Sequence, residues 1–132
     1  MKGFKTNIER DTEKNRNFRK VLYTGKHSQL VLMSLKPGEE IGLETHPEND
    51  QFLRFEGGTG QVVVDEKKYR VADGDAVVIP AGARHNVINK SDEEDLKIYT
   101  IYSPPHHKDG TIHKTKKEAE DSDEEFDGKT TE

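Results

Sequence analysis

The chain has 132 residues, of which 30% are hydrophobic and 36% are charged, so it suits one small domain that is polar for a globular protein. It contains no cysteine, which excludes disulfides, thiolate metal sites and cysteine nucleophiles. The formal net charge of −5 is concentrated in residues 115–132, which hold three Lys against eight Asp or Glu. Residues 1–114 are therefore formally neutral, and a nucleic-acid partner is not expected without a basic face.

No apolar run in the sequence approaches the length of a membrane span. The first residues also lack the apolar core of a signal peptide. We therefore expect a cytoplasmic protein that has no membrane partner.

Short apolar segments at regular intervals, separated by turns rich in Gly or Pro, predict an all-β domain. Residues 1–16 mix charge with isolated apolar positions and predict an edge strand or an extended arm. Strands are expected at residues 18–25, 28–35, 41–46 and 51–56, in a hairpin within 61–72, after Gly74 and after Gly82, and at 96–102, which closes the domain.

The sequence changes character after Ser103. Two consecutive prolines, Pro104 and Pro105, exclude regular structure at the start of this region. Thr115 and Glu118 have the spacing of a capping box, which predicts a surface helix within residues 115–126. The acidic residues 127–132 are expected to be disordered. The predicted organisation is thus a barrel with an N-terminal arm over residues 1–114 and an acidic extension over 115–132.

Four polar residues occupy the ends of predicted strands. Glu44 and His46 are two apart in one strand and so project to the same face. Gln51 opens the next strand, and His85 opens a strand after the turn at Gly82. Side chains from separate strand ends converge only if the strands curl around a common interior, as they do in a closed or half-closed β-barrel.

These residues lie in two segments that resemble the paired motifs of the cupin superfamily, over roughly residues 28–103. The second motif is matched throughout, at Gly74, Pro80, Gly82, His85 and Asn89. The resemblance implies a double-stranded β-helix, the jelly-roll barrel of cupins.

The first motif is matched at Gly38, His46 and Gly58. It departs at two ligand positions, since Glu44 stands where the motif has its first histidine and Gln51 where it has a glutamate.

We expect Glu44, His46, Gln51 and His85 to bind one divalent transition metal. The alternative is that hydrogen bonds alone satisfy these polar side chains. Two imidazoles, one carboxylate and one neutral amide suit Zn, Fe, Mn, Ni or Co and exclude the soft chemistry of Cu(I).

Three functions remain open. The ligand set resembles that of mannose-6-phosphate isomerases, which implies a metal-dependent isomerase for a small sugar, although only Arg54, Arg84 and Lys108 are candidates to bind a phosphate. Two histidines and one carboxylate are also the donors of non-haem iron dioxygenases. The third possibility is a non-catalytic cupin that binds a small polar ligand.

The remaining candidates are less specific, and no catalytic base is assigned. His106 and His107 are interpreted as part of an exposed polar turn, the alternative being that they lie over the barrel mouth as an acid or base. His27 and His113 are expected at the surface, and either Tyr99 or Tyr102 should face inward. A homodimer is expected through apolar residues that point away from the site, namely Ile41, Leu43 and Phe52.

Overall fold

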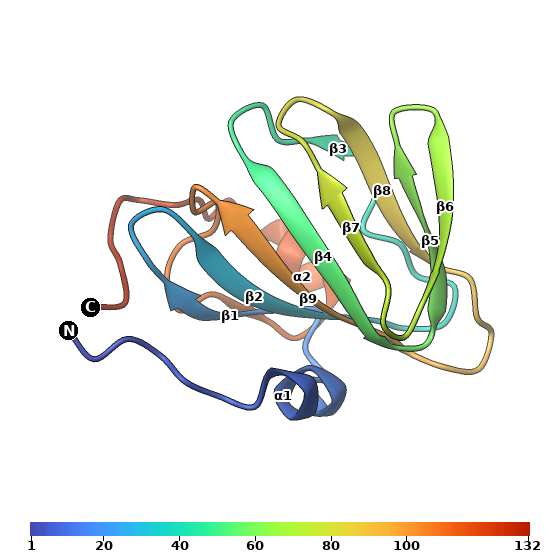
Figure 1. Ribbon diagram of the computed structural model, residues 1–132, viewed down its shortest axis with the longest axis horizontal. Coiled ribbons are helices and arrows are strands. Elements are labelled where there is room, and N and C mark those ends of the chain that lie inside the picture. The colour runs from blue at the N-terminus through green and yellow to red at the C-terminus, as the bar shows by residue number, and fades with distance from the viewer.

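The computed structural model describes residues 1–132 and shows two antiparallel sheets packed face to face (Figure 1). The larger sheet has the strand order β10-β1-β2-β9-β4-β7 and the smaller sheet the order β3-β8-β5-β6. The elements are α1 (Ile8–Lys14), β1 (Arg19–Thr24), β2 (Gln29–Leu35), β3 (Glu44–Thr45), β4 (Asp50–Gly57), β5 (Thr59–Val64), β6 (Lys67–Ala72), β7 (Ala76–Ile79), β8 (Arg84–Asn89), β9 (Leu96–Ser103), β10 (Ile112–His113) and α2 (Lys116–Asp121).

The core lies between the two sheets and follows the alternation of the strands. In β4, Gln51, Leu53 and Phe55 are buried while Phe52 and Arg54 are partly exposed. One cluster of 15 buried hydrophobic residues joins both sheets. The expected all-β jelly-roll architecture is confirmed, including the hairpin of β5 and β6. Neither helix has the length and apolarity that a membrane crossing requires.

The expectation of an edge strand or arm over residues 1–16 is wrong in part, because α1 occupies residues 8–14. Asn7 caps this helix, its side chain accepting a hydrogen bond from the backbone N–H of Arg10 at 3.0 Å. Thr12, the buried residue of the helix, donates to the carbonyl of Ile8 at 2.6 Å. The capping residue Asn7 is visible in the sequence, but the short helix has no apolar stripe from which it could have been predicted.

The expected helix in residues 115–126 is present as the shorter α2. The capping box forms, with the N–H of Glu118 donating to the hydroxyl of Thr115 at 3.1 Å and the Glu118 carboxylate accepting from the N–H of Lys114. The strand β10, which precedes α2, was not predicted. It pairs antiparallel with β1 and places Arg19 beside His113.

The chain ends lie side by side (Figure 1). Residues 127–132 were expected to be disordered, whereas in the structure they extend back to β1 and form hydrogen bonds with it. The N–H of Thr131 donates to the carbonyl of Thr24 at 2.9 Å, and the Glu132 carboxylate accepts from the Tyr23 hydroxyl and the Lys2 N–H, both at 2.6 Å. An acidic composition gives no indication of such hydrogen bonds, so the ordered end could not be predicted from it.

Candidate metal centre

Glu44, His46 and His85 meet between the sheets. β3 pairs antiparallel with β8, which places Glu44 directly opposite His85, and His46 follows β3. The Oε1 atom of Glu44 lies 3.3 Å from Nε2 of His46 and 3.6 Å from Nε2 of His85. One ligand atom from each of the three residues lies within 4.8 Å of the other two. Three of the four predicted ligands therefore form one group.

The protonation of this group suits metal binding. Nδ1 of His85 lies 3.0 Å from the carbonyl oxygen of Ala83 and donates to it, so Nε2, which faces Glu44, is the ring nitrogen that can bind a metal. Burial alone would raise the pKa of Glu44, but the close imidazoles of His46 and His85 hold that pKa well below its ordinary value. The carboxylate is therefore ionised.

The fourth predicted ligand, Gln51, is 2% exposed and points into the same interior. Its Nε2 atom donates to the hydroxyl of Thr100 at 3.1 Å, which fixes the orientation of the amide. Its Oε1 atom is buried and has no hydrogen-bond partner. The side chain thus presents a neutral oxygen donor rather than a satisfied amide.

Unsatisfied buried atoms mark this region. Nε2 of His46, Nε2 of His85 and Oε1 of Gln51 are all buried and lack hydrogen-bond partners. Each such group costs about 1–3 kcal/mol when nothing binds it. Hydrogen bonding alone therefore does not satisfy these atoms, and a divalent cation fits the two imidazoles and the carboxylate, with the amide oxygen of Gln51 as a further candidate donor.

A row of polar residues continues the site across the larger sheet. The cross-strand pairs Thr24 with Gln29, Gln29 with Tyr102 and Tyr102 with Gln51 run across β1, β2, β9 and β4. Tyr102 is therefore the inward-facing tyrosine that the alternation in β9 predicted. Burial holds the pKa of Tyr102 well above its ordinary value, so its hydroxyl is protonated.

The interpretation of His106 and His107 as an exposed turn is wrong. The two rings pack over the interior, and the ring centroids of His106 and His46 are only 4.1 Å apart. His107 is buried and its Nε2 lies 3.3 Å from the Tyr102 hydroxyl. Burial, then the charges of His107 and His46, lower the pKa of His106 to about 4.

His106 and His107 form a turn, called the histidine turn below. Two residues that the sequence analysis did not single out hold this turn in place. Gln29 accepts from the N–H groups of His106 and His107 at 3.1 and 2.9 Å and donates to the carbonyl of His107 at 2.7 Å. Glu124 lies 2.7 Å from Nδ1 of His107 and accepts from the N–H of Lys108 at 2.9 Å. Burial opposes these hydrogen bonds, which nevertheless lower the pKa of Glu124 to about 2.

The three predicted phosphate contacts are not brought to the centre. Arg54 pairs with Glu56 at 3.3 Å, and Arg84 and Lys108 are exposed. His27 is exposed as expected, but His113 is buried, which corrects the expectation of a surface residue. Ile41 packs against the core rather than pointing outward, whereas Leu43 is 60% exposed.

The chain matches proteins from several organisms. The uncharacterized protein YrkC of Bacillus subtilis is 51% identical over 124 residues, which cover 89% of this chain and 66% of that protein. The crystal structure of BH2720 from Bacillus halodurans superposes with a TM-score of 0.88 at 47% identity, covering 90% of this chain and 94% of that one. The structure of KdgF from a Halomonas species shares the fold alone, with a TM-score of 0.60, 24% identity, and coverage of 65% and 76%.

The model of the cupin domain family matches residues 31–102, which include all four predicted ligands. This range is more than half of the chain and contains every strand from β3 to β8. The chain belongs to the cupin family.

Proposed function

We infer that the protein is a mononuclear metal enzyme that transfers protons on a small oxygenated molecule, as metal-dependent sugar isomerases do. The observation that carries the proposal is the group of Glu44, His46 and His85, whose ligand atoms lie within 4.8 Å of one another, together with the buried Oε1 atom of Gln51, which lacks a hydrogen-bond partner. A bound divalent ion would polarise a carbonyl or hydroxyl group of the substrate.

The side chains beside the centre supply groups that exchange protons. His106 is partly exposed and packs against His46, so its imidazole is placed to accept a proton from a molecule bound at the centre. The Tyr102 hydroxyl and the His107 imidazole form a second pair at 3.3 Å behind it. Three proton-carrying groups at one centre favour proton transfer over simple ligand binding.

A second candidate function is iron-dependent oxygenation. It is favoured by the ligand types themselves, because two histidines and one carboxylate form the donor set of non-haem iron oxygenases. In that case Gln51 would be a weak fourth ligand. The two candidates differ in the metal they require and in whether dioxygen is consumed.

The test loads the purified protein separately with zinc, manganese or iron(II) and supplies a panel of aldoses and ketoses in deuterated water. We expect exchange of a carbon-bound proton, seen by proton NMR, without oxygen uptake. His106→Asn should retain the metal and lower the exchange rate by about 10²–10⁴-fold. Oxygen consumption with iron alone would instead support the oxygenase, and metal binding without either reaction would support a binding protein.

A further inference from the structure

A cavity of about 340 Å³ adjoins the metal centre on the side of α2. Glu44, His106 and His107 form one part of its wall, and Arg19 of β1 forms another. The remaining wall comes from Phe18, Ile41, α2 and the segment that follows α2. A cavity of this size accommodates a small metabolite. One of its walls thus carries candidate metal-site residues and another a guanidinium group.

Arg19 is a buried cation without an anionic partner. The residue is 9% exposed, and its Nε atom is buried without a hydrogen-bond partner. None of the ion pairs of the structure includes it. Its contacts are Nδ1 of His113, 3.2 Å from Nη1, and the face of the Phe18 ring, 5.4 Å from the guanidinium carbon. A buried charge is costly unless it is paired, and the nearby carboxylate of Glu124 interacts with Arg19 only through space, without an ion pair, so the guanidinium lacks a contacting anion.

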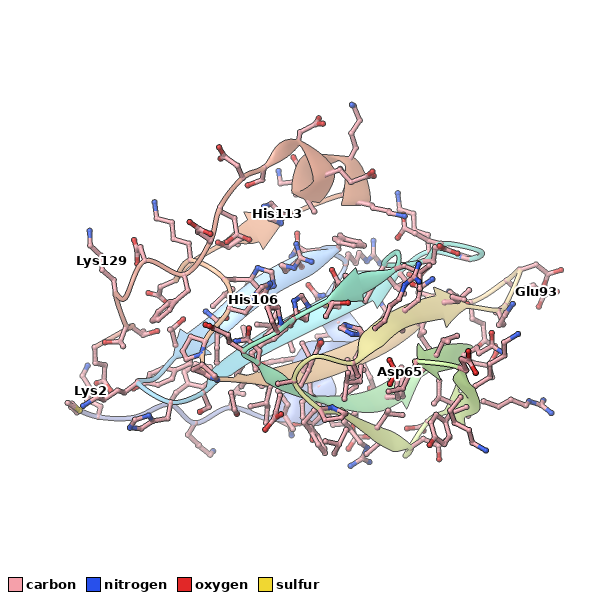
Figure 2. All side chains as sticks on the ribbon, turned by 90° about the horizontal axis from the view of Figure 1, so that it is seen from above. Lys2, Asp65, Glu93, His106, His113 and Lys129 are labelled. Atoms are coloured by element: carbon pink, nitrogen blue, oxygen red, sulfur yellow. The ribbon has the colours of Figure 1, made fainter.

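The contact with His113 does not neutralise Arg19. Burial, followed by the positive charge of Arg19, lowers the pKa of His113, so the imidazole is neutral and accepts a hydrogen bond. Figure 2 shows His113 on its short strand, away from His106. His113 therefore holds one nitrogen of the guanidinium and leaves the positive charge available to a ligand.

We propose that Arg19 binds a carboxylate group of the substrate in this cavity, so that the molecules handled by the protein are small carboxylic acids with a further oxygen function at the metal centre. The inference rests on the metal centre proposed above and names the class of substrate for it. The guanidinium fork matches the two oxygens of a carboxylate.

The charges around the cavity favour a carboxylate over a phosphate. Arg19 is the buried cation of the wall and balances one negative charge, whereas Lys116, the other cation of the lining, is half-buried on α2, one turn before the exposed Glu120. Glu124 is already bound to His107, while Glu120 and Glu125 are exposed at the rim. A dianionic phosphate would need Lys116 as a second cation and would face the carboxylates of the lining.

The test measures binding to the cobalt(II)-loaded protein. Lactate, pyruvate and gluconate, each paired with its neutral amide, are titrated while the cobalt absorption spectrum and the heat of binding are recorded. We expect at least one acid to bind more than about tenfold more tightly than its amide. In Arg19→Met the cobalt spectrum without ligand should be retained and the preference for the acid lost, with Arg19→Lys between the two.

The control is Arg70→Met, the same replacement at an exposed position of β6, which should bind the acids as the unmodified protein does. A purely structural Arg19 would lower the melting temperature in both Arg19 variants but leave the preference for acid over amide unchanged, which would overturn the proposal. Tighter binding of inorganic phosphate than of every acid would also overturn it.

Failure of the metal centre is distinguishable from failure of the carboxylate subsite. If cobalt does not bind, the proposed function fails, and the same acids are then titrated into the metal-free protein by calorimetry. A preference for acid over amide that Arg19→Met removes would support the subsite even then. Its absence would contradict the subsite as well.

Discussion

Gln29 is the residue whose replacement should most clearly uncouple the histidine turn from the barrel. It is 1% exposed, and its amide makes four hydrogen bonds, to Thr24, to both N–H groups of His106 and His107, and to the carbonyl of His107. Each hydrogen bond contributes about 1 kcal/mol net, and a buried group left without a partner costs about 1–3 kcal/mol. Gln29→Leu keeps the side-chain size, removes all four bonds and should lower the free energy of unfolding by about 3–4 kcal/mol.

The assay is urea denaturation together with amide hydrogen exchange. The N–H groups of His106 and His107 should lose protection more than those of β9, because they lose their acceptor directly. Gln61→Leu on β5 is the matched control, since the Gln61 side chain makes no hydrogen bond in the structure, and it should change stability by less than about 0.5 kcal/mol. A loss below about 1 kcal/mol for Gln29→Leu, with the two amides still protected, would refute the reasoning.

Three further predictions concern packing, pH and assembly. Gly60→Ala would bring its Cβ within 2.6 Å of the Ile88 carbonyl oxygen and should cost about 1–3 kcal/mol in urea denaturation, whereas Gly57→Ala, whose nearest contact is at 3.6 Å, should cost less. The pKa of Glu124 is about 2 against an ordinary 4.5, so its carboxylate stabilises the fold above pH 4.5 and this contribution is lost as the pH falls toward 2. In denaturation curves recorded across this pH range, Glu124→Gln should remove the part of the stability loss at low pH that comes from this carboxylate. A loss of stability at low pH equal to that of the unmodified protein would contradict the prediction. The homodimer stays a prediction: light scattering should report a dimer that Leu43→Lys dissociates, and a monomer at micromolar concentration would count against it.

The barrel was predictable because its signals are local or strictly spaced. Alternation in β4 and β9 fixes which side chains face inward: it predicted that one tyrosine of β9 is inward, which the structure shows to be Tyr102, and Gln51 is buried in β4. The spacing of Glu44 and His46, with His85 after the turn, brought three ligand atoms together as expected. These relations depend on neighbouring residues or on the register of adjacent strands.

The surroundings of the centre were not predictable, because they depend on contacts between residues that are far apart in the sequence. The position of His106 over His46 depends on Gln29, which is 77 residues away in the sequence, and on Glu124, in an acidic segment that was predicted only as a surface helix. Arg19 lines the cavity from β1, which pairs with β10. The strand β10 has only two residues, too few for a sequence pattern to be detected. Contacts between distant polar side chains leave no periodic signal.

The metal content of the purified protein tests the central claim most directly. Elemental analysis should find one transition-metal ion per chain in the unmodified protein and none in the His46→Ala, His85→Ala double variant, while His27→Ala, which replaces an exposed histidine, should retain the ion. The double variant must be folded by circular dichroism for the comparison to hold. An unmodified protein that takes up no ion when supplied with zinc, iron, manganese, nickel or cobalt, or a folded double variant that retains one, would contradict the account.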